Sequence, residues 1–156
     1  GANSETEMKE KKERCIDAIN ATKAALDEGI VPGGETALVR ASESIEELTD
    51  LTREEEIGAS IVKKACESPF RKLMTNSGFD PGQMLERLLN TKQPQGIDVI
   101  DGEVKDMIAS GIIDPVKVTK TALINAASVA NMIMVTNVLI VEEPKPSEPL
   151  KHLAVN

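Results

Sequence analysis

The chain has 156 residues, of which 40% are apolar, so it falls within the size of one domain and can bury a core. A formal net charge of -8 at pH 7, without a basic stripe interleaved with aromatic residues, argues against nucleic-acid binding. Trp and Tyr are absent and only two Phe are present, so the core must be mainly aliphatic, which suits closely packed helices.

The two cysteines and the single histidine indicate no metal or redox chemistry. Cys15 and Cys66 are far apart and form no CxxC motif, so we expect two buried thiols in a reducing compartment. His152 has no neighbouring partner for general acid–base catalysis. The most apolar stretch, 129–141, is short and interrupted by polar residues, and the sequence contains no signal peptide, so we expect a soluble protein.

The first predicted element is one long helix over residues 5–28, with Ser4 as its N-cap and Gly29 as its C-terminal stop. Its first half is almost entirely charged, whereas its second half carries an apolar stripe at helical spacing. We therefore expect this helix to leave the body at its start and to dock at its end.

Four shorter helices are predicted next. An extended link, 30–32, leads through Gly33 and Gly34 into a helix over about 35–47. A further helix is predicted over about 53–67 from its apolar residues. Two more, from Ser68-Pro69 to Gly78 and from Asp80-Pro81 to about 89, have a proline at the start.

The remainder combines a hairpin, a helix and a strand. Alternating apolar residues on either side of Asp101-Gly102 predict a β-hairpin with a type I′ turn. Asp114-Pro115 predicts the start of a last helix, with Asp114 as N-cap, that runs to about 134. Residues 138–141 predict an edge strand without a partner in the chain, and a disordered acidic, Pro-rich tail covers 142–156. The predicted fold is mainly α and multihelical.

Four features are candidates for chemistry, and each has a simpler structural explanation. Gly33-Gly34 opening a helix favours an anion, but equally suits a plain helix–helix turn. Asp17 is a candidate general base, but most such residues are only solvated. Helix capping explains Asp114, and strand alternation explains the hairpin entry Asp98-Val99-Ile100.

The sequence also lacks the complete motifs of common enzymes. It contains no GxxxxGK[ST], GxGxxG, HExxH or GxSxG pattern. One Gly-Gly link and scattered carboxylates cannot surround a transferring phosphate with donors and metal ligands. An independent hydrolase is therefore a poor interpretation.

The same four features occur together in one family. The stretch 5–25, ETEMKEKKERCIDAINATKAA, resembles the second intermediate-domain segment of group I (GroEL-type) chaperonins. EGIVPGGETAL at 28–38 resembles their Gly-rich junction into the equatorial domain, and GIIDPVKVT at 111–119 with its helical continuation resembles their last equatorial helix. The resemblance covers essentially residues 2–145.

This resemblance implies an ATP-dependent chaperonin that folds client proteins in a double-ring cage. In the family, the residue matching Asp17 activates the attacking water. The resemblance implies nucleotide contacts at Gly33, Gly34, Asp98, Val99, Ile100, Ile112 and Asp114. It further implies ATP and Mg²⁺ as cofactors, identical ring subunits, unfolded clients and a co-chaperonin as partners, and the bacterial cytoplasm or an organelle matrix as location.

The sequence departs from the family pattern in several places. Glu35 stands where a third glycine is usual, Val99-Ile100 replace small residues, and the tail lacks Gly-Met repeats. The family's Gly-Asp-Gly-Thr-Thr phosphate loop, metal-binding Asp and apical domain are not in this sequence. We therefore expect a fragment: an intermediate-domain helix over 1–28, the C-terminal half of an equatorial domain over 29–141, and the tail over 142–156.

Two interpretations remain open. The first is a chaperonin fragment that holds part of an ATP site and hydrolyses no ATP alone. The second is a standalone helical module that self-associates through exposed apolar surface and the unpaired strand 138–141. A monomer in solution would count against the second.

Overall fold

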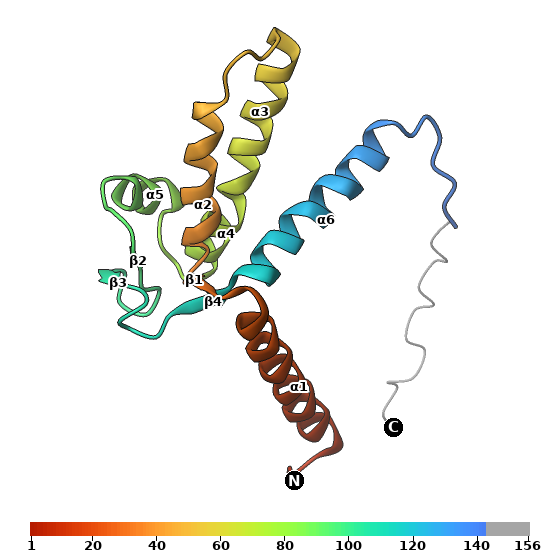
Figure 1. Cartoon of the computed structure of the whole chain (residues 1–156). Helices are drawn as coiled ribbons and strands as arrows, with labels where there is room; N and C mark the ends of the chain where they lie inside the picture. Colours follow the sequence, from red (N-terminus) through yellow and green to blue (C-terminus); the bar gives the residue numbers. More distant parts are fainter. Residues whose placement is uncertain (143–156) are drawn as a thin grey trace, which may run out of the picture.

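The computed structural model describes residues 1–142 and is mainly helical, as predicted (Figure 1). Its helices are α1 (Glu5–Glu28), α2 (Thr36–Glu43), the 3-10 helix η1 (Ser44–Glu47), α3 (Arg53–Cys66), α4 (Ser68–Asn76), α5 (Pro81–Leu89) and α6 (Val116–Met134). Its strands are β1 (Ile30–Pro32), β2 (Gln95–Ile97), β3 (Val104–Asp106) and β4 (Ile113–Pro115).

Local signals account for α1. The side chain of Ser4 accepts the N–H of Glu7, which confirms the predicted N-cap, and Gly29 ends the helix with φ of 86°. Ion pairs at i, i+4 spacing bind the charged first half together. The C-terminal part of α1 contacts β4 and α6 while its start extends away from the body, as expected (Figure 1).

The core lies among α2, α4, α5 and β2. Its buried members are Val39, Phe70, Met74, Met84, Leu85, Leu88 and Ile97. Side-chain caps begin two of the neighbouring helices. Thr52 and Glu55 form a reciprocal capping box at α3, which was not predicted from the sequence, and Asp80 caps α5, as predicted. The side chains of Ile57, Ile61 and Val62 on α3 stay exposed, and only Cys66 at the end of this helix is buried.

A two-stranded sheet that the sequence did not predict joins the segment after α1 to the start of α6. β1 pairs antiparallel with β4, with Val31 opposite Asp114 and Pro32 opposite Ile113. Asp114 therefore lies in a strand, and its predicted role as N-cap of the last helix is wrong. The N-cap of α6 is Pro115, and the N–H of Val116 donates to the Gly29 carbonyl at 3.1 Å.

The predicted hairpin exists, but its turn is longer than expected. β2 and β3 pair antiparallel with Ile97 opposite Val104, so six residues, 98–103, connect them. The N–H of Gly102 donates to the Asp98 carbonyl at 2.8 Å, which closes a larger loop than the two-residue type I′ turn. Hydrogen bonds from the Asp98 and Asp101 side chains to the loop backbone favour this wider form.

Two further predictions are wrong. Residues 138–141 form no strand, since they pair with none of the four strands within residues 1–142, and their side chains are exposed. Cys15 is exposed on the solvated part of α1, whereas Cys66 is buried as expected. The rest of the predicted tail and His152 lie outside the described residues. Within the described part of the chain, no helix has the length and apolarity to cross a membrane.

Candidate functional site

The β1–β4 pairing places the Gly-Gly junction directly against the residues before the last helix. The N–H of Gly33 donates to the Ile112 carbonyl at 2.9 Å. A Cβ added to Gly33 would lie 3.0 Å from the backbone C and O of Ile112 and from the N of Ile113. Glycine at this position is therefore required by close backbone packing, whatever the junction binds.

Gly34 and Glu35 complete a turn whose amide groups are available to a ligand. Both residues have left-handed backbones, with φ of 67° and 59°. Among residues 1–142, no acceptor binds the N–H of Gly34 or Glu35, and these groups precede the N-terminus of α2. Free amides at a helix N-terminus favour an anion or another hydrogen-bond acceptor, which is the first of the two interpretations that the sequence allowed for this junction.

Two carboxyl groups at the same junction, those of Glu35 and Asp114, disfavour a bound anion. Burial, and to a lesser extent the charge of Asp114, raise the pKa of Glu35. Burial likewise raises the pKa of Asp114. Both side chains are half-buried, and the charge of Asp114 disfavours a negative charge on Glu35. The arrangement therefore favours hydroxyl donors or a cation beside the carboxylates, and an anion only at the free amides.

The junction also packs against the start of the β2–β3 loop. A Cβ on Gly34 would lie 3.5 Å from the carbonyl oxygen of Ile97, the residue before Asp98. Asp98 is buried, and its carboxylate forms an ion pair with Lys105 at 2.7 Å. The next two residues diverge: Val99 packs against the core, whereas the Ile100 side chain is 89% exposed at the loop tip.

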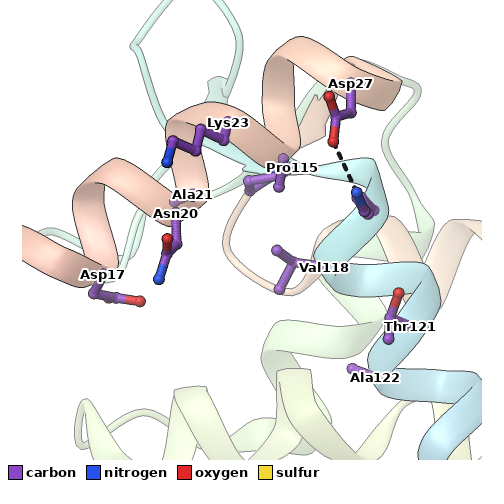
Figure 2. A pocket seen from close by; sticks show the side chains of 11 residues that line it. Asp17, Asn20, Ala21, Lys23, Asp27, Pro115, Val118, Thr121 and Ala122 are labelled. Carbon is purple, nitrogen blue, oxygen red and sulfur yellow. Dashed lines mark hydrogen bonds and ion pairs between the residues drawn. The ribbon is translucent and has the colours of Figure 1, made fainter.

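Asp17 lies elsewhere, on an exposed part of α1. It lines a groove of about 730 Å³ between α1 and the start of α6. Figure 2 shows its side chain pointing into the open space of this groove, with Val118 and Thr121 on the α6 side. The Lys117 ammonium group on α6 forms an ion pair with the Asp27 carboxylate on α1 at 2.7 Å, which connects the two helices beside this groove.

A second cavity, which Asp114 lines, lies beside the Asp17 groove. It measures about 260 Å³ and is lined by Asp114, Ile113 and residues of α1. Ala21 and Pro115 line both this cavity and the Asp17 groove, so the two cavities adjoin. The structure thus brings Gly33, Gly34, Ile112 and Asp114 together, places Asp98 next to them, and leaves Asp17 and Ile100 at the periphery.

The described residues suit a nucleotide better than a metal ion on its own. The free amides of Gly34 and Glu35 fit phosphate or carbonyl oxygens, and Asp114 fits sugar hydroxyls. No three His, Cys, Asp or Glu side chains within residues 1–142 gather as a metal site. A Mg²⁺ ion would therefore take most of its ligands from phosphates, water or residues beyond these, which is common for Mg²⁺.

Sequence reasoning missed two features of this region. The β1–β4 sheet joins segments more than 80 residues apart, and three-residue strands give almost no periodic signal. Lys105, which contacts both Asp98 and Asp101, was not singled out. Its i, i+4 spacing from Asp101 was the one available signal, but that spacing is informative mainly in helices.

Comparison with known proteins assigns this arrangement to a family. A sequence model of the TCP-1/cpn60 chaperonin family matches residues 1–144. The chain belongs to the TCP-1/cpn60 chaperonin family. Its structure is similar to that of a group III chaperonin in the open state, with a TM-score of 0.78 and 31% identity. The match covers 90% of this chain but only 30% of the group III chain, so this chain spans under a third of that protein.

Proposed function

We propose that the chain is the C-terminal part of a group I chaperonin subunit, which assists protein folding in an ATP-driven double ring. The family membership supports the chaperone role. The resemblance of the stretches at 5–25, 28–38 and 111–119 to GroEL-type sequences supports the group I assignment. In this proposal, identical subunits form the ring, and unfolded clients and a co-chaperonin are its partners, in a bacterial cytoplasm or an organelle matrix.

One observation carries the nucleotide part of the proposal: the β1–β4 pairing brings the Gly33-Gly34 turn against Ile112 and Asp114. Residues far apart in the sequence thereby form one junction with free amides on one side and a half-buried carboxylate on the other. We assign phosphate or base contacts to Gly33 and Gly34 and hydroxyl contacts to Asp114. Ile112, Asp98, Val99 and Ile100 contact the rest of the nucleotide.

Asp17 takes the catalytic role in this proposal. Its carboxylate lines the groove next to the Asp114 cavity, and the proposal places the attacking water between this carboxylate and the bound nucleotide. In water a carboxylate is a weak base, so its contribution depends on holding that water in line with the phosphate. Asp17 is thus proposed to orient and activate the attacking water.

The 156-residue chain alone is proposed to hydrolyse no ATP. The described residues supply one wall of a site, and they surround no phosphate with the donors and metal ligands that phosphoryl transfer needs. Whether the chain is an enzyme therefore depends on the intact subunit. A bound Mg²⁺ would neutralise phosphate charge there, while this chain would bind the nucleotide and orient water.

Paired measurements on the chain and on the intact subunit test these statements. We expect isothermal titration of the 156-residue chain with Mg-ATP to show no saturable binding. We expect the intact subunit to bind ATP and release phosphate, and Asp17→Ala to slow release by about 10²–10⁴-fold while ATP still binds. Phosphate release by the purified 156-residue chain, or an Asp17→Ala subunit with normal turnover, would contradict the proposal.

The alternative of an independent self-associating module receives less support. The family match extends over 1–144 and leaves little sequence for an unrelated module. The strand at 138–141 on which strand addition would depend is also not formed. A stable homodimer of the 156-residue chain with no ATP binding by the intact subunit would favour this alternative.

A further inference from the structure

One ammonium group joins the two acidic side chains of the β2–β3 loop. Lys105 Nζ lies 2.6 Å from Asp101 Oδ2 and 2.7 Å from Asp98 Oδ2. We call these three residues the lysine clamp. Hydrogen bonds to Asp101 and Asp98 raise the pKa of Lys105 to about 12, and the same bonds lower the pKa of both carboxyls. All three groups therefore stay charged around neutral pH, and the contacts keep their charge-assisted strength.

The second oxygen of each clamp carboxylate binds the loop backbone. Asp98 Oδ1 accepts the N–H of Ile100 at 3.0 Å, and Asp101 Oδ1 accepts the N–H of Glu103 at 3.0 Å. Each carboxylate thus connects the ammonium group to a loop amide. Without Lys105, two like charges would face each other without a counter-ion, and the loop would lose the group that orients both carboxylates.

The other side of the loop rests on the helical body. Arg87 Nη1 donates to the Gly102 carbonyl at 2.9 Å. The ring of Phe79 lies so close to Gly102 that a Cβ there would be 2.8 Å from it. Gly102 also has a left-handed backbone, with φ of 72°. The loop is therefore held between the body on one side and the lysine clamp on the other.

Ile100 lies on this supported loop. Its N–H is bound by Asp98, yet its side chain is 89% exposed. An apolar side chain on a loop that is already ordered loses little conformational entropy when it contacts a ligand. The flat apolar face of a nucleobase suits such a contact, and Asp98 connects this loop to the Gly33-Gly34 junction through Ile97.

We propose that Lys105 is a positioning residue of the nucleotide site, which fixes loop 98–103 so that Ile100 meets the base of bound ATP. The inference rests on the proposed function and adds a residue to which the family resemblance gave no role. Lys105 acts through Asp98 and Asp101 and does not itself touch the nucleotide.

Substitution of Lys105 tests the inference by two independent readouts. In the 156-residue chain, Lys105→Met should speed hydrogen exchange at the amides of Ile100 and Glu103, because the carboxylates that bind them lose their counter-ion. In the intact subunit, the same variant should raise KM for ATP about two- to tenfold, the range expected for ordering one or two side chains on binding. kcat should stay unchanged, because Lys105 contacts no reacting group.

Two variants serve as controls. Lys105→Arg should restore both readouts, because a guanidinium group can also contact two carboxylates. Lys63→Met should change neither, although the Lys63 side chain is 36% exposed, as is that of Lys105, and also pairs with a carboxylate, that of Glu46. The Lys63 pair lies between η1 and α3 and contacts no part of the loop.

The outcomes separate failure of the inference from failure of the proposed function. Unchanged amide exchange in Lys105→Met would overturn the lysine clamp as the support of the loop. Faster exchange with an unchanged KM would overturn its role for the nucleotide, while the proposed function would stand. An intact wild-type subunit that binds no ATP would overturn the proposed function and the inference with it.

Discussion

The helical body and the two long helices that extend from it, α1 and α6, differ in the interactions that stabilise them. The body buries seven apolar side chains of α2, α4, α5 and β2 in one cluster. In contrast, neither α1 nor α6 has a buried residue, although α6 is rich in Val, Ile and Met (Figure 1). α1 is supported by its N-cap and by i, i+4 ion pairs. Each such ion pair contributes only tenths of a kcal/mol.

This difference shows that a helix of this chain can form without burying side chains in the core. The body is stabilised by burial, which is cooperative and costly to disturb. The long helices meet the body at the β1–β4 sheet, so that sheet connects a stable region to two weakly supported ones. Most of the residues proposed to bind nucleotide lie at or near this sheet, whereas Asp17 lies on α1.

The largest effect is expected in the body. Phe70 is fully buried, and Phe70→Ala should lower the free energy of unfolding by about 3–5 kcal/mol through lost burial and a residual cavity. Urea titration followed by circular dichroism measures this loss. A loss below about 1 kcal/mol would show that the cluster does not stabilise the body as described.

The next largest effect is expected where body and long helices meet. Gly33→Ala should destabilise the chain by about 1–3 kcal/mol, because its Cβ would lie 3.0 Å from the backbone of Ile112. Gly58→Ala is the matched control: nothing lies within 4 Å of its added Cβ, and in α3 it should stabilise by about 0.5–1 kcal/mol. Equal effects of the two variants would contradict the close β1–β4 packing.

A smaller gain is expected at Glu35. Its left-handed backbone disfavours a side chain, so Glu35→Gly should stabilise by about 1 kcal/mol. Its pKa is raised in the folded state, so the folded state binds the proton more tightly and stability falls as pH rises through that pKa.

Glu35→Gln separates charge from backbone strain. It keeps the left-handed residue but removes the titration, so its stability relative to the wild type should improve from acid to neutral pH. The comparison requires thermal unfolding at several pH values. A Glu35→Gln difference that does not change with pH would show that this carboxylate is not perturbed by burial and Asp114.

The smallest effect is expected on α6. The Ile133 side chain is 68% exposed, and Ile133→Ala should change the free energy of unfolding of the 156-residue chain by less than about 0.5 kcal/mol. Urea titration beside Phe70→Ala measures the contrast directly. A loss comparable with that of Phe70→Ala would mean that α6 is packed in solution, and the distinction between the two regions would disappear.

The sequence by itself determined the elements whose signals are local. Ser4, Gly29 and Asp80 predicted helix ends that the structure confirms, because capping depends on residues three or four positions apart. Pro69 and Pro81 likewise predicted the starts of α4 and α5, which the structure confirms. Local interactions decide these features, so no knowledge of the rest of the fold was needed.

Tertiary structure alone decided how distant segments meet. It placed Asp114 in a strand opposite Val31, widened the hairpin turn around Lys105, and left 138–141 without a strand. The proposed site depends on the first two of these features. Strand pairing and ion pairs between distant segments depend on which backbone groups and charges lie close together in the folded chain. A strand of three residues is also too short for its sequence pattern to indicate which strand it pairs with.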